Sequence, residues 1–413
     1  MVIFGGNRLC GEVKVSGAKN AALPILFATI LIPKDRVLLK NVPEIRDVQL
    51  SFSILRELGI SVKKKQNLYE ISTDLACFRP PSPSMVGEMR ASTYLMGAML
   101  GRFGRVELPM PGGCDFGTRP IDLHLLAFEK LGARCEREDD RITVSAERLR
   151  GSTIVFPIVS VGATVNAVLA AIAAEGETVI VNAARETHVS DLCRFLRACG
   201  AEISGIGTSV LRVCGGKKLH GCGYRIIDDV IEMATYLSAA FVTRGEIKVK
   251  GQFDPSMESI VQPLYEMGAL IREEDDGVTL SAGGKRFGTE IRTAPSPGFP
   301  TDLHPLYTVL LCLTENGGSV EENIWQERFR YAVQLQKMGA SLRRVGTKIY
   351  AAPSTLYGGN VVAVDLRAGA ALIIAGLASC GKTVIHNTEL IERGYESITD
   401  KLCALGADIE KRQ

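Results

Sequence analysis

One phrase recurs six times along the 413 residues of this chain, and it restricts the fold more than any other feature. Each copy is a helix-like stretch that ends in glycine and leads into alternating residues, as in LRELGISV and LRACGAEI. A glycine in this position is a helix C-cap that releases the chain into a strand. The six glycines, about 70 residues apart, are Gly59, Gly132, Gly200, Gly268, Gly339 and Gly406.

Two further patterns precede each copy of the phrase. The nearer one is a short apolar strand ending in a turn, with Asn41, Asn182, Asn323 and Asn387 in matching places. The farther one is a helix rich in small residues, and it is apolar nearly all round, which predicts burial. Its six copies read AKNAALPILFATIL, RASTYLMGAML, GATVNAVLAAIAA, IEMATYLSAAFV, TDLHPLYTVLLCL and LRAGAALIIAGLA.

The repeat is therefore predicted to be a strand, a buried helix, a strand, an amphipathic helix and further strand. Its length exceeds the period of ordinary solenoids and favours closed domains over an open array. Six units make two groups of three. We expect an α/β protein of two inside-out, barrel-like domains, each built from three repeated βαβαββ-type units with helices inside and strands outside, and with an active site in the interdomain cleft.

Composition excludes several classes of protein. The chain has 48 Lys plus Arg against 46 Asp plus Glu, so its net charge is too small to attract nucleic acid or an anionic membrane. Its apolar runs are too short to span a membrane and no signal peptide opens it, which predicts a cytoplasmic protein. Eleven cysteines without a C-x-x-C pair and five scattered histidines give no metal-site pattern.

Charged residues occupy matching places in the repeat. Equivalent ends of equivalent elements should face the same side, and helix N-termini there favour anions. If the two domains oppose those sides, their basic groups line one cleft suited to phosphates and carboxylates. The buried helices begin at Lys19, Arg90, Ser160, Asp229, Asp302 and Arg367, and the following turns carry Cys114 with Arg119, Glu186, Asp254, Arg328 and Arg393.

The stretch GLASCGKT, from Gly376 to Thr383, satisfies the phosphate-loop pattern G-x-x-x-x-G-K-T. A phosphate loop follows a strand and opens a helix, whereas this stretch follows a predicted buried helix and leads into the strand TVIHN. The context therefore argues against an ATPase.

The chain is similar from end to end to the family of UDP-N-acetylglucosamine 1-carboxyvinyltransferases, which are enolpyruvyl transferases. The motifs that carry the resemblance are SGAKNAALP, MRAS, PGGCDFGTRPIDLH, SVGAT, RTAPSPGFPTD, ERF, DLRAGA and ERGYE. The resemblance implies one enolpyruvyl transferase domain over residues 20–227, carrying the Cys114 loop, and a second made of residues 1–19 and 228–413. It also implies transfer of the enolpyruvyl group of phosphoenolpyruvate to the 3-hydroxyl of UDP-N-acetylglucosamine, with release of phosphate, in peptidoglycan precursor synthesis.

The resemblance also assigns roles within a reaction that uses no metal or organic cofactor and passes through a tetrahedral intermediate. It implies that Lys19, Arg119 and Arg393 hold the phosphate and that Arg328 and Arg367 hold the carboxylate, a task suited to permanently charged guanidinium groups. Asp302 is the candidate base. The remaining substrate contacts implied are Asn20, Arg90 and Ile324 for the amino sugar and diphosphate region, and Arg119, Pro120, Ile121, Asp122, Leu123, Ile158, Val159, Ser160 and Val161 for uracil and ribose.

Cys114 is a thiol on a Gly-Gly loop in polar company, although cysteines usually prefer the interior. Nearby cations help a thiol lose its proton, while the adjacent Asp115 tends to raise its pKa, which favours a proton donor over a resting thiolate. The family's loop is a lid, and its cysteine is the target of fosfomycin. His124 is interpreted as ordering this loop rather than taking part in the chemistry.

Some positions depart from the family pattern, and three alternatives stay open. The family usually has Pro-Asp-Arg-Ile-Glu where this chain has Asp228 and Val230 in place of the proline and arginine, which bears on the choice of acceptor. A paralogue could use another uridine nucleotide, such as UMP. The chain could also be a non-catalytic sugar-nucleotide sensor or, least favoured, a repeat scaffold for protein partners.

Overall fold

The computed structural model describes residues 1–109, 120–252 and 254–411. The chain forms two compact units. Unit 1 contains Met1–Ser16 and the chain from Asp228 onwards, and unit 2 contains the described residues from Gly17 to Ile227. The chain therefore passes from one unit to the other at Ser16–Gly17 and again at Ile227–Asp228.

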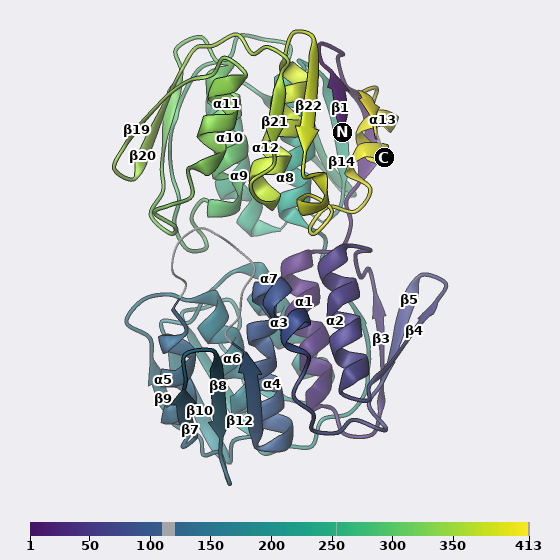
Figure 1. The fold of residues 1–413 in the computed structure, drawn as a ribbon, viewed down its shortest axis with the longest axis vertical. Helices are drawn as coiled ribbons and strands as arrows, with labels where there is room; N and C mark the ends of the chain where they lie inside the picture. Colours follow the sequence, from purple (N-terminus) through teal and green to yellow (C-terminus); the bar gives the residue numbers. More distant parts are fainter. Residues whose placement is uncertain (110–119, 253, 412–413) are drawn as a thin grey trace. The chain divides into compact units, whose positions relative to one another are not determined.

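Three apolar helices are buried in each unit, and they are the six segments predicted from the repeat. The helices are α1 (Lys19–Ala28), α4 (Tyr94–Phe103) and α6 (Val161–Ala171) in unit 2, and α8 (Val230–Val242), α10 (His304–Cys312) and α12 (Leu366–Ala378) in unit 1. In unit 1 the three pack against one another, and in unit 2 helix α4 packs against both α1 and α6 (Figure 1). A Cβ atom on Gly97 would come within 2.6 Å of the Asn166 carbonyl oxygen, so the glycine lets two of these helices meet backbone to backbone.

Short 3-10 turns extend three of the buried helices. They are η1 (Thr29–Leu31) after α1, η2 (Arg90–Thr93) before α4 and η4 (Thr301–Leu303) before α10. The stretch from Gly376 to Thr383 ends α12 and leads into a strand, as expected from the repeat. It therefore lacks the strand-to-helix context of a phosphate loop.

A second set of six helices is amphipathic, and each ends next to one of the repeat glycines. All six glycines have positive φ, between 78° and 102°, which L side chains rarely adopt. This confirms the predicted C-caps. The helices are α2 (Arg46–Glu57), α5 (Asp122–Lys130), α7 (Thr187–Ala198), α9 (Glu258–Glu266), α11 (Arg330–Lys337) and α13 (Ile398–Ala404), with α3 (Pro83–Glu88), η3 (Pro255–Met257) and η5 (Thr388–Leu390) as additional pieces.

Each repeat contributes one small sheet, and every four-stranded sheet combines one parallel pair with two antiparallel pairs. The sheets of unit 2 have the orders β13-β3-β5-β4 (Gly223–Arg225, Arg36–Lys40, Leu68–Ser72, Ser61–Lys65), β6-β8-β7 (Arg105–Pro109, Arg141–Ser145, Arg134–Arg137) and β11-β12-β10-β9 (Glu202–Ser204, Val210–Gly215, Gly176–Val181, Thr153–Val155).

The sheets of unit 1 follow the same plan, but two of them include strands from the N-terminus. Their orders are β15-β16-β14-β2 (Leu270–Glu274, Gly277–Ser281, Glu246–Lys250, Cys10–Lys14), β17-β18-β20-β19 (Glu290–Arg292, Gly318–Glu321, Lys348–Ala352, Ser341–Val345) and β21-β22-β1-β23 (Asn360–Val362, Lys382–His386, Val2–Phe4, Asp408–Glu410). Strand β1 pairs on both sides, with Val2 opposite Val384 and Glu410.

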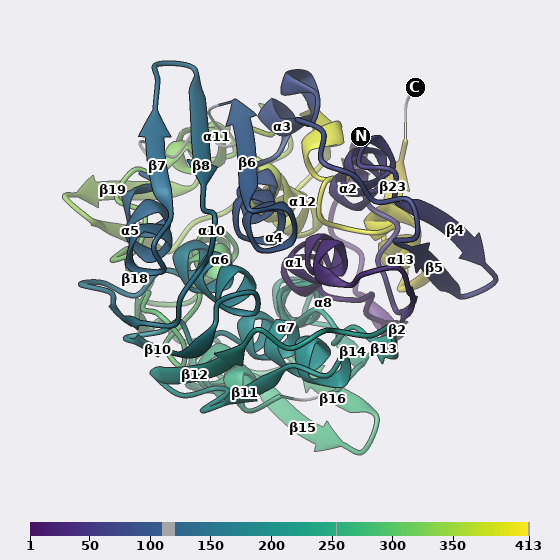
Figure 2. The ribbon, with the colours of Figure 1, turned by 90° about the horizontal axis from the view of Figure 1, so that it is seen from below.

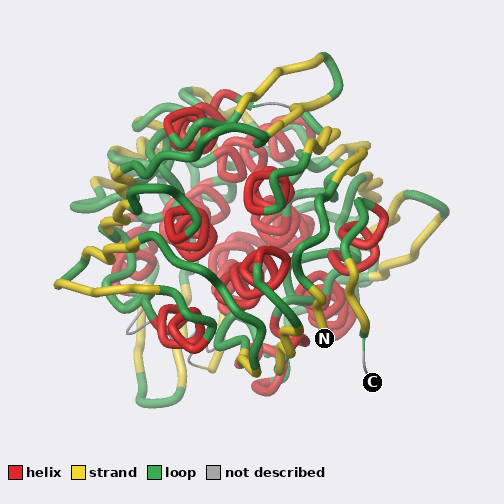
Figure 3. Tube along the Cα trace, turned by 90° about the horizontal axis from the view of Figure 1, so that it is seen from above, coloured by secondary structure: helices red, strands yellow, loops and turns green. Residues whose placement is uncertain are grey.

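Helices occupy the inside of each unit and strands the outside. In Figure 2, α1, α4 and α6 of unit 2 are surrounded by their sheets, and Figure 3 shows strands along the rim. The strands alternate accordingly: Val37 and Leu39 of β3 are buried, and the residues beside them are exposed. The inside-out α/β architecture predicted from the repeat is confirmed for each unit.

Candidate functional site

Asp302 lies between two arginines in unit 1. Its Oδ1 is 2.8 Å from Nη2 of Arg328, and its Oδ2 is 3.1 Å from Nε and 3.0 Å from Nη2 of Arg367. The arginine side chains are only 5% and 4% exposed. The structure thus brings together three predicted site residues that are 26 and 65 positions apart in the sequence.

The beginnings of the repeat helices position these three side chains. Asp302 is in η4, immediately before α10, and Arg328 lies in the turn before α11, where its N–H donates to the Trp325 carbonyl. Arg367 is the second residue of α12. The N-cap of α12 is Asp365, whose Oδ1 accepts the N–H of Arg367 at 2.8 Å and thereby fixes the first turn.

The charge of Asp302 is held by its two neighbours. Burial would raise the pKa of Asp302, but the charges of Arg367 and Arg328, and the hydrogen bonds that they donate, outweigh it and hold the pKa well below its usual range. In turn, Asp302 outweighs the effect of burial on Arg367 and raises the pKa of that arginine. While both arginines contact it, Asp302 is a bound carboxylate with little affinity for a proton.

Tyr395 supports Arg367 from another side. The guanidinium lies 5.4 Å from the centre of the tyrosine ring, and the hydroxyl of Tyr395 is 2.8 Å from Oγ1 of Thr235 in α8. Arg393, a predicted phosphate contact, is two residues before Tyr395 in the turn between η5 and α13, and its side chain is half-buried.

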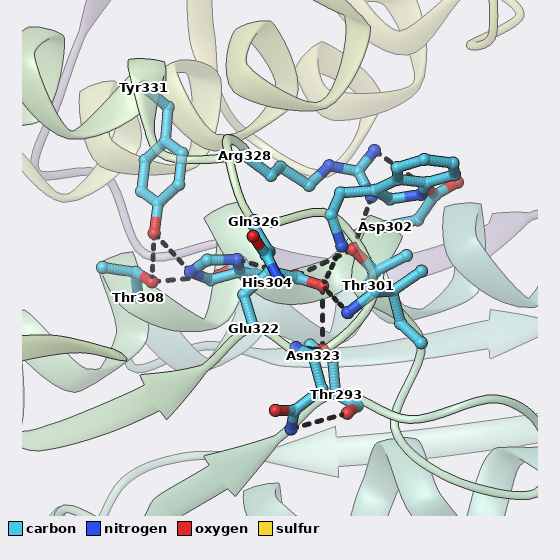
Figure 4. A network of polar contacts seen from close by, with 12 residues as sticks. Thr293, Thr301, Asp302, His304, Thr308, Glu322, Asn323, Gln326, Arg328 and Tyr331 are labelled. Carbon is cyan, nitrogen blue, oxygen red and sulfur yellow. Dashed lines mark hydrogen bonds and ion pairs between the residues drawn. The ribbon is translucent and has the colours of Figure 1, made fainter. Parts of the chain in front are cut away.

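A buried carboxylate, Glu322, lies behind this cluster (Figure 4). Its Oε2 accepts hydrogen bonds from Oγ1 of Thr301 at 2.8 Å and from Nδ1 of His304 at 3.1 Å. Thr301 Oγ1 also accepts a hydrogen bond from Nη1 of Arg328 at 2.9 Å, so the network reaches the Asp302 cluster. On the other oxygen, Oε1, Glu322 accepts the N–H groups of Ile324 and Trp325 at 2.8 and 2.9 Å.

Lys19, the predicted phosphate contact in unit 2, starts helix α1. Its Nζ is 2.7 Å from Oδ2 of Asp47, which lies in the first turn of α2 and is only 4% exposed. Asn20, the next residue of α1, is half-buried. A nearly buried ion pair with one carboxylate fixes the ammonium group at the start of the helix.

His124 and Asn166 form a buried pair in unit 2. Asn166 Nδ2 is 2.8 Å from Nδ1 of His124, and it also donates to the Thr93 carbonyl. Burial, with a smaller contribution from the charge of Arg90, lowers the pKa of His124 to about 3. His124 is therefore neutral and holds α5 to Asn166 of α6, while its predicted part in ordering the Cys114 loop stays a prediction.

The two stretches predicted to bind uridine lie side by side. Residues 158–161 lead into α6, where the hydroxyl of Ser160 caps the helix by accepting the Ala163 N–H at 3.3 Å. Beside them is α5, because a Cβ atom on Gly162 would come within 2.9 Å of Cε1 of His124. The predicted contacts here are Ile158 (66% exposed), Val159, Ser160 and Val161, together with Pro120, Ile121, Asp122 and Leu123, of which Ile121 is buried.

Four predicted residues remain to be considered. Ile324 is half-buried and is held by Glu322. Arg90 opens η2 and is half-buried. Cys114 and Arg119 lie outside the described residues, so their predicted roles stay predictions.

Comparisons with known proteins show the family to which the chain belongs. Residues 3–402 match the family of EPSP synthase (3-phosphoshikimate 1-carboxyvinyltransferase). The chain is 45% identical over 410 residues to UDP-N-acetylglucosamine 1-carboxyvinyltransferase 3 of Caldanaerobacter subterraneus subsp. tengcongensis, covering 99% of this chain and 98% of the relative. It is 44% identical over 415 residues to UDP-N-acetylglucosamine 1-carboxyvinyltransferase 2 of Clostridium acetobutylicum, covering 100% and 99%. The chain belongs to the enolpyruvyl transferase family.

Solved enolpyruvyl transferases share its architecture. The crystal structure of the enolpyruvyl transferase NikO from Streptomyces tendae matches with a TM-score of 0.88 and 25% identity, over 99% of this chain and 98% of the other. EPSP synthase from Acinetobacter baumannii matches with a TM-score of 0.76 and 19% identity, over 99% of each chain, which supports the fold alone. Among the described helices of this enolpyruvyl transferase, none has both the length and the apolarity that a membrane span needs.

The sequence analysis of this enolpyruvyl transferase missed three residues that hold the site together. They are Asp47, which pairs with Lys19; Asn166, which pairs with His124; and Glu322. The repeat contained a signal for one of them. Glu322 comes directly before Asn323, whereas Lys40, Val181 and His386 precede the matching asparagines, so an acidic residue stands at that place in one repeat.

Proposed function

We propose that this enolpyruvyl transferase moves the enolpyruvyl group of phosphoenolpyruvate onto the 3-hydroxyl of UDP-N-acetylglucosamine and releases phosphate, as a step in making peptidoglycan precursors. The observation that carries the proposal is the full-length identity of 42–45% to relatives that bear this activity in their names. The Asp302 cluster supplies a charge pattern that suits the reaction.

The carboxylate site is proposed to be Arg328 and Arg367. Both guanidinium groups already bind a carboxylate, that of Asp302, and are almost completely buried. Their planar forks match a carboxylate in geometry and keep their charge at any relevant pH. The carboxylate of phosphoenolpyruvate therefore competes with Asp302 for the same donors.

This competition gives Asp302 a way to become a base. When the substrate carboxylate takes donors from Arg328 and Arg367, Asp302 loses hydrogen bonds that hold its pKa down, and its affinity for a proton rises. The 3-hydroxyl of the sugar can then give its proton to Asp302 as its oxygen attacks C2 of phosphoenolpyruvate. A proton is added to the methylene carbon, for which Cys114 is the proposed donor, and this gives a tetrahedral intermediate with a methyl group. The methyl group then gives a proton back to the Cys114 thiolate as the bond from C2 to the phosphate oxygen breaks, so the double bond re-forms and phosphate is released.

The phosphate of phosphoenolpyruvate is assigned to Lys19, Arg119 and Arg393. The support from the described residues is that Lys19 is held at the start of α1 by Asp47 and that Arg393 adjoins Tyr395, the residue under Arg367. The uridine moiety is assigned to residues 120–123 and 158–161, which pack together where α5 meets α6. The proposal needs no metal or organic cofactor.

A phosphate-release assay tests the function. We expect release with phosphoenolpyruvate plus UDP-N-acetylglucosamine, and mass spectrometry should find the enolpyruvyl ether of the sugar nucleotide. Release with UMP in place of UDP-N-acetylglucosamine would instead identify a paralogous acceptor. Binding of the sugar nucleotide without phosphate release would show a sensor and would overturn the proposal.

A further inference from the structure

Glu322 is a buried acid that the proposed reaction does not use. Its residue is fully buried, yet its carboxylate accepts hydrogen bonds from five groups of the described chain. Burial would raise the pKa of Glu322, but its partners, His304 first, lower it to about 2. Packing alone does not require a buried charge, because an apolar side chain of similar size would fill the same space without the cost of desolvation.

The two oxygens of Glu322 hold different parts of the site (Figure 4). Oε1 accepts a hydrogen bond from the Thr293 hydroxyl at 2.9 Å and two more from the N–H groups of Ile324 and Trp325 in the turn. Oε2 accepts hydrogen bonds from Nδ1 of His304 and from the Thr301 hydroxyl. One oxygen therefore shapes the turn, and the other reaches toward the arginine cluster.

The hydroxyl of Thr301 connects Glu322 to Arg328. A hydroxyl has one proton to donate and lone pairs to accept with. Because Thr301 gives its proton to Glu322, its oxygen is left to accept the N–H of Arg328 Nη1 at 2.9 Å. The negative charge of Glu322 thus fixes the direction of the threonine hydroxyl, and that direction fixes one corner of the guanidinium group.

His304 prevents Glu322 from turning away. Burial lowers the pKa of His304, which keeps the ring neutral, so Nδ1 donates to Glu322 and Nε2 accepts the hydroxyl of Tyr331 at 2.8 Å. Tyr331 is in turn 2.7 Å from Oγ1 of Thr308 on α10. The carboxylate is therefore fixed from both the turn and the helix.

We propose that Glu322 is a positioning residue of the carboxylate-binding site, which orients Arg328 through the Thr301 hydroxyl. This proposal rests on the proposed function, in which Arg328 binds the carboxylate of phosphoenolpyruvate. Glu322 does not touch the substrate, and it acts by fixing one guanidinium before the substrate arrives. Small errors in such positions cost an enzyme much of its binding and rate.

The hydrogen bonds from Glu322 to Arg328 are tested at Thr301, because a change there leaves the buried charge of Glu322 in place. Thr301→Val keeps the size of the side chain and removes the hydroxyl, and we expect the KM for phosphoenolpyruvate to rise about tenfold while the KM for UDP-N-acetylglucosamine stays within about twofold. Thr301→Ser keeps the hydroxyl and should restore the wild-type value. The matched control is Thr314→Val, which removes a buried hydroxyl bonded to the Leu311 carbonyl beyond the other end of α10.

Two results would overturn the proposal. One is a KM for phosphoenolpyruvate in Thr301→Val that is unchanged from the wild type. The other is an equal rise in Thr314→Val, because that would show a general effect of losing a buried hydroxyl. A lower melting temperature in the control without a change in this KM supports the proposal.

Calorimetric titration with phosphoenolpyruvate, alone and with UDP-N-acetylglucosamine present, separates this inference from the proposed function. If the wild-type protein releases no phosphate, the proposed function fails, but binding that Thr301→Val weakens would still support the role of Glu322. No binding of phosphoenolpyruvate to the wild type would overturn both.

Glu322→Gln adds a readout that does not depend on catalysis. An amide has one accepting oxygen, so it cannot serve both sets of donors. Trp325, the only tryptophan in the chain, reports on the turn held by Oε1. We expect Glu322→Gln to shift its fluorescence and raise the KM for phosphoenolpyruvate, whereas Thr301→Val should change the KM with little spectral shift. An unchanged KM in Glu322→Gln would contradict the proposal.

Discussion

Oδ2 of Asp302 contacts both nitrogens on one edge of the Arg367 guanidinium, Nε at 3.1 Å and Nη2 at 3.0 Å. The other carboxylate oxygen, Oδ1, accepts a hydrogen bond from Nη2 of Arg328. The candidate base therefore contacts both arginines of the candidate carboxylate site.

Replacing Asp302 by asparagine should separate the two roles. We expect Asp302→Asn to lower kcat about 10²- to 10⁴-fold, the usual contribution of a general base. The KM for phosphoenolpyruvate should not rise, because a neutral amide competes less for the arginines than a carboxylate does. Steady-state kinetics measures both, with Asp275→Asn, in an exposed hairpin turn, as the control. A large rise in this KM with unchanged kcat would contradict both assignments.

His124 should make the protein sensitive to acid. The histidine of the unfolded chain titrates near pH 6.5, whereas burial lowers the pKa of His124 in the folded protein to about 3. Between these two values the unfolded chain binds a proton at this residue and the folded protein does not. The free energy of unfolding should therefore fall by about 1.4 kcal/mol per pH unit from this group as pH drops from about 6.5 toward 3.

Thermal unfolding across that pH range, compared with His124→Gln, measures the effect of this histidine. Glutamine keeps an acceptor for Asn166 and does not titrate. The variant should lose less stability than the wild type on acidification. Parallel curves for the two proteins would show that His124 is not buried in the neutral form.

Cys114 should be the residue that fosfomycin modifies. We expect mass spectrometry to find one adduct on the wild-type protein and none on Cys114→Ser, which should also lose activity if the thiol donates the proton to carbon. Cys380→Ser, which removes an exposed thiol of the described chain, is the matched control and should remain sensitive. Unchanged labelling and activity in Cys114→Ser would remove the thiol from the mechanism.

Gly162 should tolerate no side chain while His124 stays in place. A Cβ atom there would lie 2.9 Å from Cε1 and 3.1 Å from Nε2 of the imidazole. Gly162→Ala should therefore destabilise the protein by about 1–3 kcal/mol, as overpacking of a core does. Chemical denaturation measures this. Combination with His124→Ala should recover part of the loss, and equal losses with and without the imidazole would refute the predicted clash.

Much of the fold could be predicted because the same pattern of buried helix, amphipathic helix and helix-ending glycine occurs six times in the sequence. One helix-ending glycine, such as Gly59, is weak evidence for a helix boundary. Six of them at regular spacing define the repeat unit and favour closed domains over an open array. The buried helices could be predicted because their apolar residues leave no polar face. The repeat also predicted that Asp302 and Arg367 lie at the beginnings of buried helices and Arg328 in a following turn, and the structure brings the three into contact.

The partners of the charged residues could not be predicted in the same way. Asp47 pairs with Lys19 from a different helix, and Asn166 reaches His124 across 42 positions. Such pairs depend on how side chains meet in space, and each occurs in a single repeat. Arg328 and Arg367 were assigned to the carboxylate of the substrate, and nothing in the sequence indicated that the carboxylate of Asp302 contacts both of them.

The position of β1 has a consequence for how the chain is made. Strand β1 is completed only by β22 and β23, which the ribosome makes long after β1. The described strands of unit 2 all lie before Ile227, so that unit can fold during synthesis, while β1 must wait unpaired until β22 has been made. A ribosome that stalls before it reaches β22 therefore leaves β1 without its partner strands, as an open edge that can pair with another chain.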